Sequence, residues 1–543
     1  MEHLEQRQKI MIMLAIMSAM LFAALNQTIV GTALPTIIAD LGGFDLYSWI
    51  FTIYMLTSSV TAVLVGKLSD IYGRKPFILI GIGVFTLGSF LSGLSETTIQ
   101  LIIYRGIQGF GAGMIMSTAF TAVGDLFAPR ERGRWQGIMG SVFGLASVFG
   151  PTLGGWIVDN TDWNWVFWIF LPFGLVAFGM IAKLFPAQEK REREPVDFQG
   201  SILLTLTIVP LLLAFTWGGQ DYDWVSFPII GLFVATIIAL IFFIWTEGRT
   251  KSAVMPLELF KNDIFTLSNI TGFILGMGMF GAIMYMPMFI QGVMGASASE
   301  SGFIMMPMTL SMVAASTIGG QLITKTGKYR IFASIGLFVM GAGMVFISTL
   351  NADSTFWLVI AGIIILGAGL GLSMPVFTLA VQNAVDHKYL GVATASSQLF
   401  RQIGGTVGVA IMGSLMNLSI TKNLEESGMS LPSDPALAGE LGQFADPQAL
   451  LNQDQIESVR ASLSGEELVV FDQLIGSLIE ALGSSISFVF LIGAIAIGVG
   501  FILTFFLREI PLRTSNEAAV GEGEKKSLTK TSAKSHPRPS QGS

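Results

Sequence analysis

Cysteine is absent from the 543 residues, and histidine occurs only three times. A chain without cysteine has no disulfide framework, no thiolate nucleophile and no cysteine-ligated zinc or haem. The histidines are scattered at His3, His387 and His536, which is not the close spacing of a metal site. We therefore expect neither a metal nor a cofactor.

Charged residues are also scarce, at 12% of the chain against about a quarter in a typical soluble domain. Hydrophobic residues make up 52%, and the mean hydropathy is +0.67. The apolar runs are too long and too many for one soluble core, which indicates a membrane protein and excludes a soluble enzyme or a disordered chain. The net charge of -7 is divided among short loops, so nothing supports nucleic-acid binding.

Fourteen segments are long enough to span a bilayer, which takes about 20 apolar residues. Their cores are 10–33, 48–66, 77–95, 98–124, 135–157, 164–184, 199–219, 225–246, 265–289, 301–323, 331–350, 356–380, 391–416 and 484–507. The first is too long for a signal peptide and lacks a small-residue cleavage site, so we expect it to be retained. The prediction is an all-α membrane protein with 14 transmembrane helices.

The distribution of lysine and arginine predicts the orientation, because these residues gather in cytoplasmic loops. With the N-terminus inside, 26 of the 30 basic residues fall in inner segments. Only Lys422 and Arg460 fall in an outer loop, while Arg105 and Arg401 lie within spans. We therefore expect both termini to be cytoplasmic.

An internal repeat predicts the domain organisation. The segment 66–76 (GKLSDIYGRKP) matches 320–330 (GQLITKTGKYR), and the glycines of 109–113 are echoed in 367–371. Each pair falls at the same place in two groups of six spans, which is typical of transporters with facing repeats. The predicted units are a six-helix half over 1–195, two linker helices over 196–250, and a second six-helix half over 251–510.

Two segments fall outside this pattern. The long outer loop 417–483 contains apolar residues at helical spacing from Phe471 to Leu482, which predicts an amphipathic helix or hairpin. We interpret it as a lid on the bilayer surface, with a substrate-contacting element as the alternative. Residues 511–543 are polar and predict a disordered cytoplasmic tail.

The repeat and four local motifs together resemble the major facilitator superfamily, and within it the fourteen-span drug:proton antiporter family of bacterial multidrug exporters. The motifs are the loop 66–76, RGIQG at 105–109, GPTLGG at 150–155, and LNQTIV with ALP over 25–35. The resemblance covers about residues 10–510. It implies that the loop forms a cytoplasmic gate in which Asp70 meets the start of span thirteen near Gly391. The residues assigned to this gate are Gly66, Asp70, Gly73, Arg74, Asp125 and Gly391.

Elementary chemistry supports the gate, because a carboxylate is stabilised at a helix N-terminus and an arginine can hold it there. Asp125 and Arg134 are candidates to extend the network. In the second copy Thr324 replaces the acid, so we expect a latch on one side only.

Two arginines within spans are candidates for proton coupling or substrate binding, since a buried guanidinium is costly. The resemblance implies a role in proton transfer for Arg105, and Gln108 lies one turn away. Arg401 lies between two glutamines in span thirteen. A structural alternative for both is that they hold helix carbonyls in place.

Span one carries Asn26 where many relatives of this type have aspartate, so this position cannot titrate. No acid lies in any span core, which leaves Asp40, Asp45, Asp70 and Asp125 for proton coupling. The missing charge argues against dications and favours neutral, zwitterionic or anionic amphiphiles. Candidate cleft residues are Asn26, Gln27, Met114, Met116, Phe120, Asn269, Met277, Met284, Tyr285, Met305, Met306 and Gln382.

In span five, Pro151 disrupts a helical turn, and Gly150, Gly154 and Gly155 admit close helix packing. The segment can pack tightly or flex, and the resemblance implies that it marks exporters. The predicted function is therefore proton-driven efflux of amphiphilic compounds by a monomer in the cytoplasmic membrane. The alternative is export or flipping of an endogenous envelope lipid or metabolite. No catalytic constellation supports an enzyme.

Overall fold

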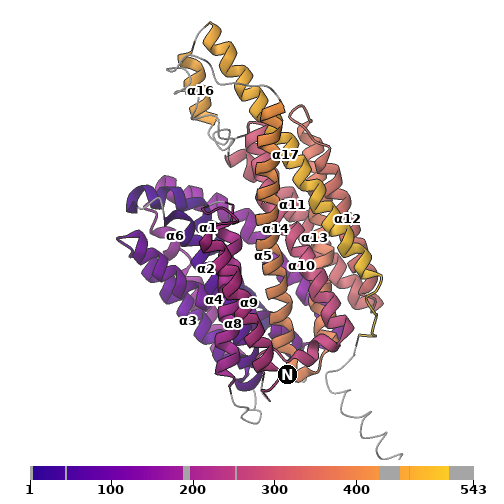
Figure 1. Ribbon diagram of the computed structural model, residues 1–543. Coiled ribbons are helices and arrows are strands. Elements are labelled where there is room, and N and C mark those ends of the chain that lie inside the picture. The colour runs from indigo at the N-terminus through magenta and orange to yellow at the C-terminus, as the bar shows by residue number, and fades with distance from the viewer. Residues whose placement is uncertain are drawn as a thin grey trace, which may run out of the picture.

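The computed structural model describes residues 4–42, 46–186, 196–219, 221–250, 253–296, 298–426, 453–463 and 465–512. Their regular structure is helical (Figure 1). The helices are α1 (Gln6–Leu41), α2 (Tyr47–Tyr72), α3 (Arg74–Ser92), α4 (Thr98–Leu126), α5 (Pro129–Asn160), α6 (Trp165–Trp168), α7 (Leu171–Leu184), α8 (Phe198–Trp217), α9 (Phe227–Glu247), α10 (Asp263–Met288), α11 (Ala298–Thr326), α12 (Arg330–Ser348), α13 (Phe356–Ala384), α14 (Leu390–Glu426), α16 (Gln453–Ser462) and α17 (Glu466–Thr504).

Each predicted span coincides with a helix, which confirms the all-α membrane architecture. Thirteen of the spans are long and apolar enough by composition to cross a membrane. The remaining one, α4, carries Arg105 and Asp125, which lower its mean hydropathy, but it is 29 residues long and packs between α2 and α3. The sixth span is interrupted between α6 and α7, next to Pro172.

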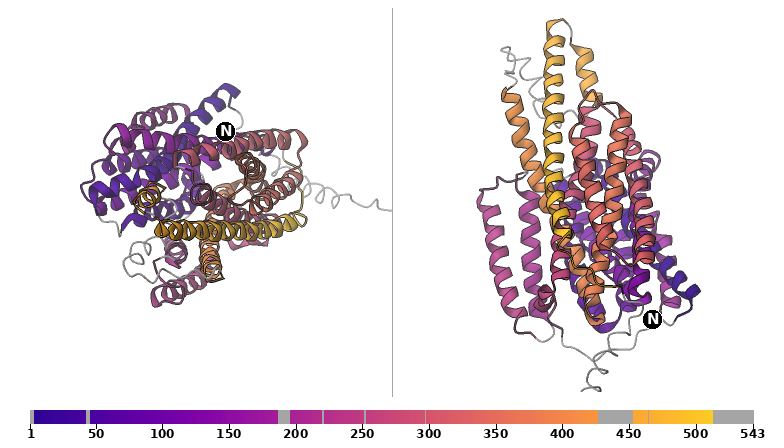
Figure 2. Two further views of the ribbon diagram at one scale, coloured as in Figure 1. Left: turned by 90° about the horizontal axis from the view of Figure 1, so that it is seen from above. Right: turned by 90° about the vertical axis from the view of Figure 1, so that its right-hand side faces the viewer.

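The helices form two bundles, which we call the N-terminal bundle (α1–α7) and the C-terminal bundle (α10–α14 and α17). Helices α8 and α9 pack on each other at the periphery, where α8 touches α2 and α14 (Figure 2). The boundaries predicted at 195 and 250 remain predictions, and residues 187–195 and 251–252 lie outside the described ranges. The predicted tail also lies outside them, apart from its first two residues.

We call the end of the molecule that carries the turn between α2 and α3 the motif end, and the opposite end the far end. The start of α1 lies at the motif end, because the ammonium of Lys9 sits 5.7 Å from the ring centre of Phe127, just after α4. Tyr329 binds the last described segment to the same end, since its hydroxyl donates to Arg508 O at 2.9 Å.

The internal repeat is reproduced in the packing. A Cβ on Gly111 of α4 would lie 2.4 Å from the backbone nitrogen of Phe85 in α3. A Cβ on Gly369 of α13 would lie 2.3 Å from the backbone nitrogen of Met340 in α12. Each glycine therefore allows its helix to pack closely against the neighbouring helix of the same bundle, which is the packing role predicted for these glycines.

The interpretation of 471–482 as a surface lid is wrong. These residues belong to α17, which continues without a break from Glu466 into the last span. Phe471, Leu478 and Leu482 are buried in the C-terminal bundle's core cluster together with Val293 and Ile456. The apolar stripe is in register with the span that follows, and no proline separates them, so one long helix forms. Residues 427–452 of the predicted loop lie outside the described ranges.

Candidate functional site

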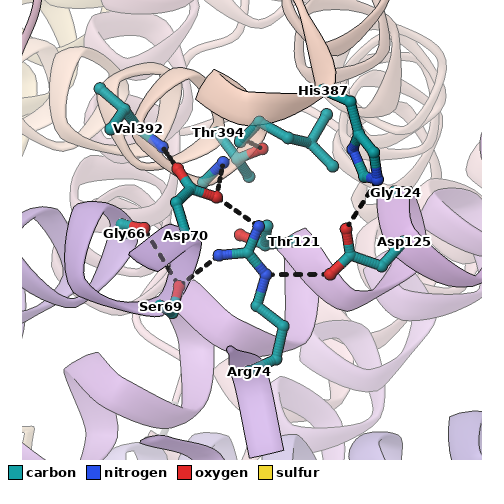
Figure 3. Close-up of polar contacts among 12 residues, drawn as sticks. Gly66, Ser69, Asp70, Arg74, Thr121, Gly124, Asp125, His387, Val392 and Thr394 are labelled. Atoms are coloured by element: carbon teal, nitrogen blue, oxygen red, sulfur yellow. Dashed lines mark hydrogen bonds and ion pairs between the residues drawn. The ribbon is translucent and has the colours of Figure 1, made fainter. Parts of the chain in front are cut away.

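The two bundles meet at the motif end through the carboxylate of Asp70 (Figure 3). Asp70 lies in the last turn of α2, and its Oδ1 and Oδ2 accept hydrogen bonds from Gly391 N at 3.0 Å and Val392 N at 3.1 Å. These N–H groups belong to the first turn of α14 and have no acceptor within that helix. The positive end of the helix dipole also favours the carboxylate there.

Arg74 holds this carboxylate from the N-terminal bundle. Its Nη2 donates to Asp70 Oδ1, its Nε donates to Asp125 Oδ2 at 3.0 Å, and its Nη1 donates to Ser69 Oγ at 2.6 Å. All three charged groups are buried. Asp125 also lies 3.5 Å from Nε2 of His387, which precedes α14, so it faces the C-terminal bundle as well.

Glycines allow this close approach. Gly73 forms the turn that brings Arg74 back toward Asp70, with φ at +89°. A Cβ on Gly391 would lie 2.4 Å from Gly66 O, so α2 and α14 touch backbone to backbone. All six residues predicted for the gate are thus brought together in one contact. Arg134 is exposed, and Arg132 takes the buried position, donating to Gly124 O at 2.8 Å and Phe127 O at 3.1 Å.

The second seam lacks the acid of the first but has a contact of another kind, which the sequence analysis did not expect. At the equivalent seam, Arg130 of α5 donates from Nε to Thr324 O at 3.1 Å and from Nη2 to Lys325 O at 3.3 Å, at the end of α11. A Cβ on Gly320 would lie 2.3 Å from Gly133 O. The sequence comparison looked for an acid at position 324 and missed a base on the opposite helix, which binds helix-terminal carbonyls.

A pocket lies between the bundles, on the far-end side of these contacts. Its lining residues are Phe120, Gln136, Gly140, Ser316, Met374, Pro375, Thr378 and Arg401. Gln136 Nε2 donates to Gln382 Oε1 at 2.9 Å, one turn closer to the motif end than Thr378. This hydrogen bond joins α5 to α13 and closes the pocket toward the motif end.

Arg105 lies in a separate, fully buried polar cluster within the N-terminal bundle. Its Nη1 donates to Gln108 Oε1 at 2.5 Å and to Asn26 Oδ1 at 3.2 Å, and its guanidinium carbon is 4.2 Å from the ring centre of Tyr54. Its Nε donates to the carbonyl of Ile50 at 3.4 Å. The predicted contact with Gln108 is present, and Asn26 is the partner that spacing did not indicate.

The segment 150–155 lies in α5 against α1. A Cβ on Gly150 would lie 1.9 Å from Thr28 Oγ1, and one on Gly154 would lie 2.9 Å from Ile29 O. Gly155 has no atom within 4 Å of that position, so its predicted packing role is not present in this state. Pro151 lies inside α5, which continues through it.

Most of the predicted cleft residues lie elsewhere. Phe120 lines the pocket, and Gln382 closes it. Asn26, Met114, Asn269 and Tyr285 are buried inside the bundles, and Met284 is exposed. The abundance of methionine favoured methionines as cleft residues. The pocket is instead lined by residues from five helices, which only the packing of these helices brings together.

Comparison with known proteins identifies the family. A family model described as the Major Facilitator Superfamily matches residues 16–409. The multidrug transporter protein MdtP of Bacillus subtilis is 40% identical over 540 residues, covering 97% of each chain. Multidrug resistance protein 3 of the same organism is 34% identical over 509 residues, covering 93% of this chain and 96% of the relative.

The fold agrees with that of a solved structure. The proton:xylose symporter XylE superposes with a TM-score of 0.61 over 95% of this chain and 99% of its own, at 12% identity. At this identity the likeness concerns the fold alone. With the family model, the two bacillary relatives and the paired six-helix bundles in agreement, the chain belongs to the major facilitator superfamily of membrane transporters.

Proposed function

We propose that the protein exports amphiphilic drugs or toxic compounds across the cytoplasmic membrane, as a monomer, by alternating access driven by the proton gradient. The contact that carries this proposal is the one from Asp70 to the start of α14. It joins the two bundles at the motif end, where α2 ends and α14 begins. A substrate can pass the motif end only when this contact breaks. The similarity to two bacillary proteins named for multidrug transport and multidrug resistance supports multidrug export.

The predicted orientation places the motif end in the cytoplasm. The polar contacts between the bundles described above run from the pocket to this end, which supports a state closed toward the cytoplasm. Opening it would remove two N–H donors from Asp70 and separate Asp125 from His387. Both carboxylates would then lose groups that stabilise their charged forms.

Asp70 and Asp125 are therefore our candidates for the proton-dependent step. Asp40 at the far end is engaged otherwise, since its Oδ2 accepts from Trp163 Nε1 at 2.7 Å. Asp45 lies outside the described residues. Among the described residues, the helices that line the pocket carry acids only in their terminal turns.

The proposal is tested in everted membrane vesicles that contain the full chain. Accumulation of a neutral, an anionic and a cationic fluorescent amphiphile is followed while a pH gradient is imposed and then collapsed with a protonophore. Accumulation of at least one dye that requires the gradient supports proton-driven export. No response of any dye would contradict it, and changed lipid composition in a deletion strain would then favour the alternative of lipid export.

A further inference from the structure

We propose that Arg401 in the pocket between the bundles recognises the anionic group of an amphiphilic ligand. This inference rests on the proposed function only in taking the pocket as the place where transported compounds bind. It adds the chemical class of the ligand: a carboxylate, sulfonate or phosphate attached to an apolar body.

The first argument is the unbalanced charge of Arg401. The eight residues that line the pocket include no carboxylate, and Arg401 makes no hydrogen bond or ion pair within the described part of the chain. Acids on the five lining helices lie in their end turns, and Asp125 is already bound to Arg74. A partly buried guanidinium without a counter-charge attracts an anion, since desolvation of the cation has no compensation inside the protein.

The second argument is an unpartnered polar atom on the opposite wall. Gln136 is 2% exposed, and its Oε1 has no hydrogen-bond partner, while its Nε2 is engaged with Gln382. A buried acceptor of this kind is costly unless a ligand or water donates to it. A hydroxyl or N–H group on the ligand would satisfy this acceptor in place of water.

The remaining walls come from both bundles and combine apolar residues with the hydroxyl-bearing Ser316 and Thr378. Phe120 belongs to the N-terminal bundle, and Met374 and Pro375 belong to the C-terminal bundle. A ligand held by Arg401 on α14 and by Gln136 on α5 would touch both moving parts at once. In this closed state the free volume of the pocket is about 10 Å³, which is room for about one water molecule, so a ligand enters only when the bundles move apart.

Arg105 does not serve the same role. Its guanidinium is completely buried and already bound to Asn26, Gln108 and the Ile50 carbonyl. A ligand in the pocket would have to open the N-terminal bundle to reach it. Arg401 is therefore the cation available to a bound compound.

The test uses two dyes with the same aromatic skeleton, 8-anilinonaphthalene-1-sulfonate and neutral N-phenyl-1-naphthylamine, which differ by the sulfonate. Both carry an N–H group for Gln136. Binding to the full chain in phosphatidylcholine nanodiscs is measured by calorimetry and corrected with empty nanodiscs. The variants are Arg401→Gln, Arg401→Lys and, as a charge-matched control, Lys183→Gln, whose side chain is exposed at the end of α7.

We expect the sulfonate to bind about tenfold more tightly than the neutral dye, as a charge-assisted hydrogen bond predicts. Arg401→Gln should remove this difference while the neutral dye binds as before, which also shows that the variant is folded. Arg401→Lys should retain part of the difference, and Lys183→Gln should retain all of it. Equal affinities in the unmodified chain, no specific binding of the sulfonate, or equal losses of both dyes in Arg401→Gln would overturn the inference.

A further arm distinguishes the source of the anion. Part of the phosphatidylcholine is replaced by phosphatidylglycerol, and the dye titration is repeated. Weaker sulfonate binding in the unmodified chain but not in Arg401→Gln identifies a lipid headgroup as the competing ligand at Arg401. An unchanged affinity assigns the site to free amphiphiles. Because no step depends on a gradient, failure of this test leaves proton-driven export untouched, and the reverse also holds.

Discussion

The carboxylate of Asp70 lies 3.0 Å from the backbone nitrogen of Gly391, and these two residues are 321 positions apart in the chain. The same carboxylate binds Val392 N and Arg74, so both of its oxygens are satisfied across the boundary between the bundles. The side chain of Asp70 therefore connects the contact between α2 and α14 to the ion pairs that Arg74 makes with Asp70 and Asp125.

Asp70→Asn is expected to abolish export while the protein remains inserted. The amide keeps the size of the side chain but replaces one acceptor with a donor that faces other donors, and it leaves Arg74 with less compensation. Breaking a buried ion pair costs about 3–5 kcal/mol, which would lower the population of the closed state by at least about a hundredfold. Dye export at matched membrane content measures this, with Asp353→Asn at an exposed far-end position as control. Normal export by Asp70→Asn would remove the carboxylate from the gate.

Gly391→Ala is expected to prevent closure of the motif end. The added Cβ would lie 2.4 Å from Gly66 O, and two backbones cannot yield as a flexible side chain would. Gly231→Ala in α9 is the matched control, because nothing lies within 4 Å of its Cβ position. Export by both variants is compared, together with accessibility of single cysteines placed at the motif end of this cysteine-free chain. Equal activity of the two variants would show that the gate closes less tightly than described.

Thr324→Asp is expected to slow transport by strengthening the second seam. The new carboxylate would lie beside Arg130, which now donates to the carbonyls of Thr324 and Lys325. Because Arg130 is exposed, the added ion pair is worth at most about 1 kcal/mol, which corresponds to a few-fold change in turnover. A double-mutant cycle with Arg130→Ala isolates the interaction, and Thr324→Asn controls for size. A coupling energy of zero would mean that the two side chains do not meet.

Asn26→Asp is expected to leave the preference among charged dyes unchanged. The family resemblance suggested that an acid at this point of span one would favour cations, but Asn26 is fully buried and its Oδ1 already faces Arg105 and Gln108. A carboxylate there would pair with Arg105 inside the bundle and present no charge to the pocket. Competition between ethidium and a neutral dye during export measures the preference. A marked gain for ethidium would show that position 26 contacts the substrate.

The sequence was informative where a feature is local or repeats along the chain. Apolar runs located every span, and the spacing of Arg105 and Gln108 predicted their contact because residues three apart share a helix face. The meeting of Asp70 with Gly391 followed from the resemblance of the loop to a known family. It did not follow from spacing, since nothing local encodes a partner on a distant helix.

The failures have a common physical origin in packing between distant helices. Asn26 binds Arg105 across 79 positions, and Arg130 finds its carbonyl acceptors across 194 and 195 positions. The residues around Arg401 come from five helices, and none of them stands out by type. The stripe in 471–482 was interpreted as a separate helix because its apolar spacing carries no information on where a helix begins.

Helix α14 runs unbroken from the gate at Leu390 to Glu426, so it behaves as a rigid lever about 55 Å long. A rotation of 10° about the gate would move its far tip by about 10 Å, a displacement large enough for a bound probe at the far end to detect or block. Near this tip Asn423 donates to the hydroxyls of Ser484 and Ser485 in α17, and the part of α17 that precedes them extends beyond the bundle on the same side (Figure 2). An antibody fragment raised against this far-end extension would therefore report the state of a gate at the other end of the molecule, or arrest it.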